Sequence, residues 1–140
     1  MIEWLQLPNE RKREIIDQVN NRTGLPVKAI EKDWWVTLVL KAAFSTPWAA
    51  NIVFKGGTSL SKSWNLIERF SEDVDLALDR SVLRVGEITS GNQIKKLRRL
   101  SAEFIVNEFT PVLRDTIFAM GVSPKLFNLV VRPTDQPDID

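Results

Sequence analysis

The chain has 140 residues, which suits one domain with a substantial core, and its 19 basic and 18 acidic residues leave a net charge of +1. This balance indicates no partner, so a nucleic-acid surface would need local clustering of basic residues. Cysteine and histidine are absent, which excludes disulfides, zinc sites built from thiolates or imidazoles, and Ser-His or Cys-His nucleophilic catalysis. Any metal would be a hard ion bound by oxygen ligands.

Residues 1–50 are predicted to form a helical lead-in. One helix is expected over 7–24, with Pro8 in its first turn and Gly24 as its stop. A second helix restarts at Pro26 and is apolar over so much of its circumference that we expect it to be largely buried. No stretch has the length of a membrane span and the N-terminus lacks a signal-peptide pattern, so we expect a cytoplasmic protein that makes no use of a membrane.

Residues 51–80 are predicted to form the centre of a small sheet. The run NIVFK (51–55) is typical of a short buried strand, and a helix is expected to begin at Thr58. Polar and apolar residues alternate with period two in DVDLALD (73–79), which predicts a second strand.

Residues 91–132 are predicted to contain a long helical stretch and a third strand. Pro111 lies inside the helical stretch and predicts a kink or two abutting helices, while Gly121 is expected to end it. The run FNLVVR (127–132) is the third strand candidate. The order of elements predicts a single α+β domain over the whole chain, in which helices flank a small sheet.

Two carboxylates, Asp73 and Asp75, lie one residue apart in the second predicted strand. Alternate side chains of a strand point to the same face, so these carboxylates should project together and repel each other unless a cation lies between them. Oxygen-only ligation suits Mg²⁺ or Mn²⁺. Taken alone, the pair also fits a solvated strand end or a turn capped by Asp73.

A glycine turn, Gly56-Gly57-Thr58-Ser59, lies between the first predicted strand and the following helix. Glycines there allow backbone amides to approach a phosphate, the helix N-terminus adds partial positive charge, and the two hydroxyls can donate to the same anion. The same residues also fit a tight turn capped by Thr58. A phosphate cradle followed by paired carboxylates is, however, the arrangement that nucleoside triphosphate chemistry requires.

The combined run GGTSLSKSW…RFSEDVDLAL resembles the signature of the nucleotidyltransferase-like AbiEii/AbiGii toxin family, within the polymerase-beta-type nucleotidyltransferase superfamily. EKDWWVTLVLKAAF (31–44) resembles the family's helix before the first strand. The resemblance implies an Mg²⁺- or Mn²⁺-dependent transferase that moves a nucleoside monophosphate from an NTP to RNA, with tRNA favoured, or to a protein hydroxyl. It also implies a cognate antitoxin of a toxin–antitoxin or abortive-infection system.

The resemblance implies roles for particular residues. Asp73 and Asp75 match the metal-binding Asp-x-Asp pair and would be the catalytic residues. The residues implied in nucleotide binding are Gly56, Gly57, Thr58, Ser59, Lys62, Arg69 and Ser71. Lys55 also belongs to the signature. Lys62 fits a solvated side chain as well, and Arg69 fits an ion pair with Glu72.

Members of this family are usually about twice as long, and the superfamily uses a third carboxylate on a later strand. We therefore expect the chain to be an N-terminal part of such a protein, with the third carboxylate and a downstream lysine beyond residue 140. The alternative functions are a catalytically inactive module that binds nucleotide or antitoxin, a truncated fragment, or a purely structural domain.

A basic run, QIKKLRRLS, contains Lys95, Lys96, Arg98 and Arg99 within one and a half helical turns. It fits either attraction of RNA or nucleotide phosphates, or an ordinary solvated helix face, because no aromatic residues interleave with it. Most of the tryptophans lie in apolar patterns and are expected to pack in the core.

Overall fold

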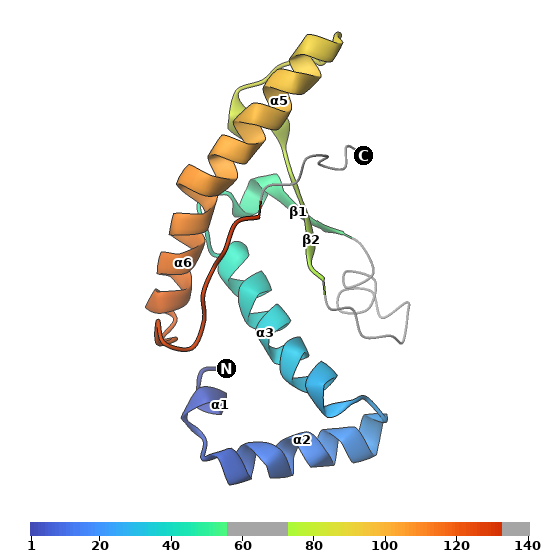
Figure 1. Cartoon of the computed structure of the whole chain (residues 1–140), viewed down its shortest axis with the longest axis vertical. Helices are drawn as coiled ribbons and strands as arrows, with labels where there is room; N and C mark the ends of the chain where they lie inside the picture. The colour runs from blue at the N-terminus through green and yellow to red at the C-terminus, as the bar shows by residue number, and fades with distance from the viewer. Residues whose placement is uncertain (56–72, 133–140) are drawn as a thin grey trace.

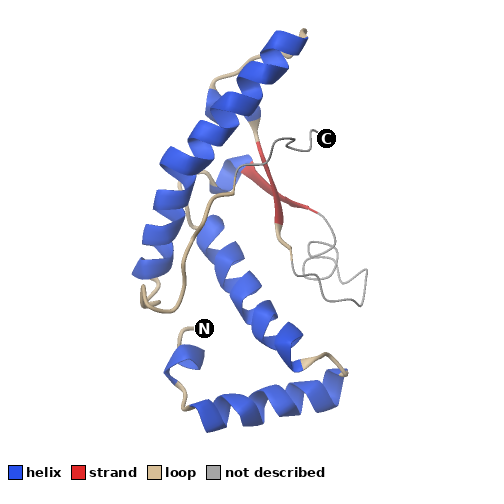
Figure 2. Ribbon diagram, in the orientation of Figure 1, coloured by secondary structure: helices blue, strands red, loops and turns tan. Residues whose placement is uncertain are grey.

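The computed structural model describes residues 1–55 and 73–132 (Figure 1). Within these residues the fold is mixed α+β, with helices arranged around a two-stranded antiparallel sheet (Figure 2). This arrangement confirms the predicted fold class. The expected helix from Thr58 and the tail after residue 132 lie outside the described residues.

Three helices form the N-terminal part: α1 (Glu3–Gln6), α2 (Asn9–Thr23) and α3 (Val27–Ala43). Pro8 and Pro26 each stand immediately before a helix, where a missing N–H costs nothing. Gly24 ends α2 in the left-handed conformation, with φ of 71°, and its N–H donates to the carbonyl of Asn20. Both predicted helices of the lead-in are therefore confirmed.

The core lies where α3 crosses α6 (Thr110–Ala119). Its buried residues come from these two helices and the turn that follows α6: Leu38, Ala42, Ala43, Leu113, Ile117 and Val122. Trp34 and Trp35 pack against this cluster but are only half-buried. The prediction of a largely buried α3 thus holds for one side only, because α2 and α6 cover part of its circumference and leave Val27 exposed.

The two strands are β1 (Ile52–Lys55) and β2 (Asp75–Leu78). A short helical turn, η1 (Ala49–Asn51), leads directly into β1. The strands pair in antiparallel register, from Ile52 opposite Leu78 to Lys55 opposite Asp75. The prediction that β1 is a buried strand is wrong: Ile52 is buried, but Val53 is 63% exposed because it points to the face of the sheet away from the core.

One nearly continuous helical stretch follows the sheet. After η2 (Arg80–Leu83), it comprises α5 (Gly91–Phe104), a π-helical turn η3 (Ile105–Phe109) and α6. Pro111 cannot donate to the carbonyl of Asn107, and its ring would collide with that carbonyl in α-helical winding. A wider π turn immediately before the proline relieves both problems. The predicted distortion at Pro111 is confirmed, in the form of this turn, and Gly121 follows the helix end with φ of 96°.

The predicted third strand over 127–132 is wrong, since these residues adopt no regular secondary structure. Their alternation is nevertheless real: Phe127 and Leu129 pack against the core, whereas Val130 is 66% exposed. A strand requires a hydrogen-bonded neighbour as well as alternation, and among the described residues only β1 and β2 pair in a sheet. The period-two pattern of 127–132 therefore indicates a segment that packs alternate side chains on the core, and not a strand of the sheet.

We expect Gly24→Ala to lower the free energy of unfolding by about 1 kcal/mol, because alanine is strained at positive φ. Space is not the cause, since nothing lies within 4 Å of the added Cβ. Urea unfolding of the chain measures the change. Gly86→Ala is the matched control, as it is equally open but lacks the positive φ; an equal loss in both variants would contradict the left-handed cap.

Candidate functional site

The end of the sheet at which β1 finishes and β2 begins carries the predicted carboxylates. Asp75 is the first residue of β2 and lies directly opposite Lys55, the last residue of β1. Side chains opposite each other in an antiparallel pair have their Cβ atoms about 5 Å apart. Asp73 precedes β2 by two residues, and both aspartates are exposed. The chain thus leaves β1 beside the point where it enters β2, with one lysine and two carboxylates at that junction.

The alternation of β2 explains why these groups face solvent. Leu76 packs against the core cluster, and Phe54 lies opposite it on the same face of the sheet. Neighbouring residues must therefore point to the other face, which places Lys55 and Asp75 together on the outer side. Core packing of a single leucine consequently directs the lysine and the carboxylate outward.

The predicted phosphate-binding residues lie outside the described residues. They are Gly56, Gly57, Thr58, Ser59, Lys62, Arg69 and Ser71. The structure therefore describes where Asp73 and Asp75 lie, while their metal-binding role and the phosphate-binding residues stay predictions. What sequence reasoning missed is the pairing of Lys55 with Asp75, which counting residues along two antiparallel strands could have revealed.

The donor set at this junction fits a hard divalent cation. Mg²⁺ is commonly held by one or two carboxylates together with substrate phosphates and water, and two exposed aspartates supply that number of carboxylates. Within the described ranges, no group of three or more acidic residues could hold a metal ion. Asp73 and Asp75 thus stay the predicted cation ligands, as a pair and not as part of a larger acidic cluster among the described residues.

Asp79, an acid at the opposite end of β2, has a structural task. Its side chain caps η2 by accepting a hydrogen bond of 2.8 Å from the N–H of Ser81. Its own N–H donates to the carbonyl of Asn51, which ties the end of β2 to the turn before β1. The backbone hydrogen bond from Ser81, joined by that residue's hydroxyl, lowers the pKa of Asp79 below its ordinary value of 3.8.

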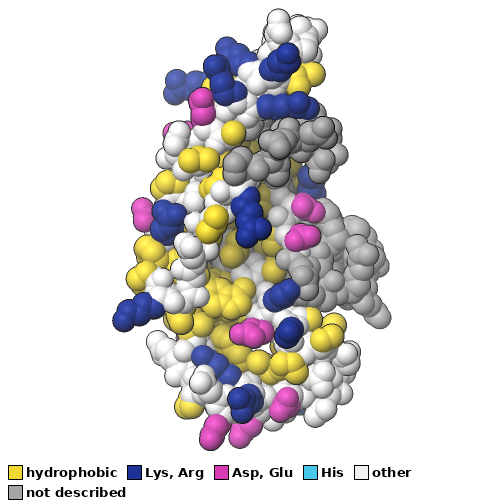
Figure 3. Space-filling view, viewed as in Figure 1, with side chains coloured by type: hydrophobic (Ala, Val, Ile, Leu, Met, Phe, Trp, Pro, Cys, Tyr) yellow, Lys and Arg dark blue, Asp and Glu magenta, His cyan; other side chains and the backbone are white. Residues whose placement is uncertain are grey.

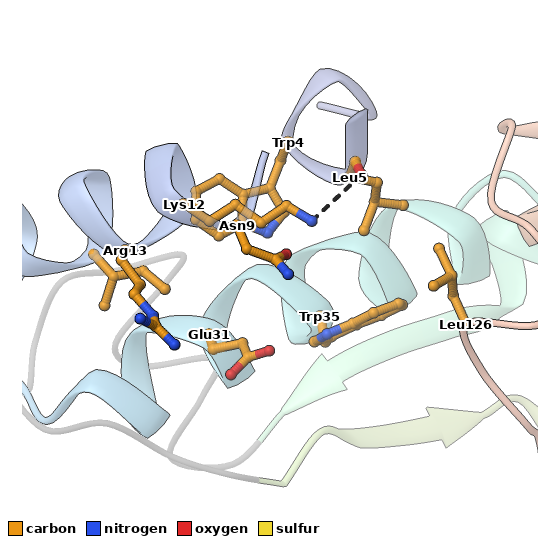
Figure 4. A pocket seen from close by; sticks show the side chains of 9 residues that line it. Trp4, Leu5, Asn9, Lys12, Arg13, Glu31, Trp35 and Leu126 are labelled. Carbon is orange, nitrogen blue, oxygen red and sulfur yellow. Dashed lines mark hydrogen bonds between the residues drawn. The ribbon is translucent and has the colours of Figure 1, made fainter. Parts of the chain in front are cut away.

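A hollow lies among the N-terminal helices and is separate from the carboxylates. This hollow of about 320 Å³ is lined by Trp4, Leu5, Asn9, Lys12, Arg13, Ile16, Glu31, Trp35 and Leu126 (Figure 4). Lys12 spans it by donating to the carbonyl of Leu5 at 3.3 Å. The tryptophans here serve packing, as predicted for most of them: the rings of Trp34 and Trp35 meet edge to face at 4.9 Å.

A family model described as "Nucleotidyl transferase AbiEii toxin, Type IV TA system" matches residues 38–122, which is more than half of the chain. The matched segment includes Lys55, Asp73, Asp75 and the helical stretch from α5 to α6. No curated protein and no solved structure matches the chain significantly. In the parts of the chain that the structure describes, there is no helix with the length and apolar character needed to cross a membrane.

We expect Asp79→Ala to lower the urea midpoint at pH 7 by removing the η2 cap. Because the folded-state pKa of Asp79 is depressed, its stabilisation is present above the unfolded pKa near 3.8 and is lost as the pH falls through the lower folded value. The difference in urea midpoint between the parent and Asp79→Ala should therefore shrink below pH 4. Urea unfolding at a series of pH values from 7 to below 4 measures it. Glu87→Ala is the control for loss of an exposed acid. A difference in urea midpoint between the parent and Asp79→Ala that stays constant with pH would contradict the cap.

Proposed function

The chain belongs to the AbiEii nucleotidyl transferase toxin family of type IV toxin–antitoxin systems, and on this premise we propose that it transfers a nucleoside monophosphate from an NTP to a hydroxyl group of RNA. We further propose tRNA as the favoured acceptor, Mg²⁺ or Mn²⁺ as the cofactor, and a cognate antitoxin protein as a partner. The site lies at the junction of β1 and β2.

One observation of the fold supports this assignment above the others. The family match covers the junction at which Lys55 lies opposite Asp75, and it includes Asp73, which precedes β2 by two residues. A structural strand end would not need two exposed carboxylates one residue apart, preceded in the sequence by a glycine motif. A nucleotidyl transfer site does need them, because the triphosphate and its cation must meet there.

In the proposed reaction, an acceptor hydroxyl oxygen attacks the α-phosphorus of the NTP. The bond from the α-phosphorus to the oxygen that bridges to the β-phosphorus breaks, pyrophosphate leaves, and the hydroxyl proton passes to a carboxylate or to a downstream lysine. Asp73 and Asp75 would hold the cation, which would offset the negative charge of the triphosphate. By resemblance, the Gly56–Ser59 turn would hold the triphosphate, with Lys62, Arg69 and Ser71 near it.

We expect Asp73→Asn and Asp75→Asn each to weaken Mn²⁺ binding and to reduce NMP transfer more than about 100-fold, since even residues that only support metal ligands commonly contribute 10- to 100-fold. Calorimetry with MnCl₂ measures binding, and labelled NTPs with a total tRNA pool measure transfer. Asp79→Asn is the matched control, because it removes one charge at the other end of the same strand.

Three results would count against parts of this proposal. Mn²⁺ binding unchanged in both aspartate variants would overturn the metal site. Binding of Mn²⁺ and NTP without transfer of label would indicate an inactive nucleotide-binding module. Transfer of label to protein instead of RNA would show that the acceptor is a protein hydroxyl, and the proposed nucleotidyl transfer would still hold.

We expect Lys55→Met to bind Mn²⁺ about threefold to tenfold more tightly than the parent, because Lys55 lies opposite Asp75 in the sheet and its positive charge would repel a cation bound there. The same calorimetric titration with MnCl₂ measures the increase in Mn²⁺ affinity. Lys55→Arg keeps the positive charge and should stay close to the parent. Equal affinities of the methionine and arginine variants would show that Lys55 does not act on the carboxylates through its charge.

A further inference from the structure

The middle of α5 carries a concentrated positive surface, which we define as the α5 basic face: Lys95, Lys96, Arg98 and Arg99. All four residues are exposed. At 3.6 residues per turn they lie within an arc of about 160°. Ile94, Leu97 and Leu100, which lie on the other side of the helix, are only partly exposed. The amphipathic pattern of α5 therefore gathers its positive charges on its solvent side.

Among the residues that the structure describes, these charges have no acidic partner. Their side chains form no ion pair or hydrogen bond with other residues in the described part of the chain. Glu103 is the one acid in α5 and lies one turn beyond the face. The basic residues of α2 differ, because Arg11 pairs with Glu14 at 2.9 Å and Lys12 donates to a backbone carbonyl. Solvated helices of this protein thus carry mixed charge, whereas the α5 basic face carries one sign.

The position of the face suits a large ligand. The C-terminal half of α5, with Leu100 and Phe104, contacts η2, which follows the end of β2 remote from Asp75. The helix rises about 1.5 Å per residue, so Lys96 lies about 12 Å beyond Phe104 along its axis. Figure 1 shows the N-terminal part of α5 beyond the end of β2 that is opposite the carboxylate junction, and Figure 3 shows basic side chains gathered at that pole. A ligand that contacts both places must extend past the whole length of β2, which suits a polynucleotide.

We propose that the α5 basic face is the docking surface for the phosphate backbone of a base-paired segment of the acceptor RNA. This inference rests on the proposed function. Lysine and arginine without interleaved aromatic residues recognise phosphates and offer no platform on which an unpaired base could stack. The face therefore positions the RNA without reading its sequence, and the carboxylate junction acts on a distant part of the same molecule.

The test compares the 140-residue parent with the variant K95Q/K96Q/R98Q/R99Q, in which glutamine preserves helix propensity. Fluorescence anisotropy with a labelled tRNA, at several salt concentrations and without NTP, measures affinity. We expect binding to weaken at least tenfold at low salt and the slope of log affinity against log salt to fall by about three. The pairs K95Q/K96Q and R98Q/R99Q should each give about half of that change in slope.

The matched control is R11Q/R22Q/K28Q/K41Q, which removes four exposed positive charges from α2 and α3. It should keep the parental salt slope within about one unit. Mn²⁺ and NTP binding by the α5 variant should equal that of the parent, which separates this inference from the proposed function.

Equal losses in the two quadruple variants, or no loss in either, would overturn the docking surface while leaving the carboxylate site untouched. Failure of the parent itself to bind tRNA would also overturn it. If the α5 variant bound tRNA like the parent but lost affinity for an acidic antitoxin protein or for anionic vesicles, the face would be assigned to that partner instead of RNA.

Discussion

The antiparallel pairing of β1 with β2 is the constraint on which the candidate site depends. Its register puts Lys55 opposite Asp75 and brings the exit of one strand beside the entry of the next. Backbone hydrogen bonds set this geometry, and the packing of Leu76 on the core decides which face the charged residues occupy. A slip of one residue would send Asp75 toward the core and Leu76 into solvent, so the apolar cluster stabilises the site indirectly.

The helices around the sheet hold that register in place. α3 and α6 build the cluster against which Leu76 packs, and Trp48, just before β1, contacts Phe104 and Phe109 of the long helical stretch at 4.9 and 5.9 Å. The π turn before Pro111 itself supplies Phe109 to these contacts, whereas Phe104 precedes the turn and the core residues of α6 follow it. Aromatic contacts before and within the turn, together with aliphatic contacts after it, therefore join the sheet to both halves of the helical stretch.

Local signals in the sequence predicted the helices with high fidelity, because prolines and left-handed glycines act within one turn. Pro8, Pro26, Gly24 and Gly121 all lie at or beside the helix ends that they indicated. Signals that depend on a partner were less informative. The alternation of 127–132 was correctly recognised yet predicted a strand, since hydrogen-bonded neighbours are a property of the fold and not of the segment.

The sequence by itself determined which chemistry is available: without histidine or cysteine, the candidate ligands are carboxylates, and the pair Asp73 and Asp75 is visible from its spacing. It also determined the family, through motifs that span the sheet. Only the tertiary structure decided that Lys55 stands against Asp75, that Asp79 is a cap, and that the α5 basic face lies apart from the carboxylates. The reason is physical, since spacing along a chain fixes side-chain direction within one element, whereas neighbours from different elements are set by core packing.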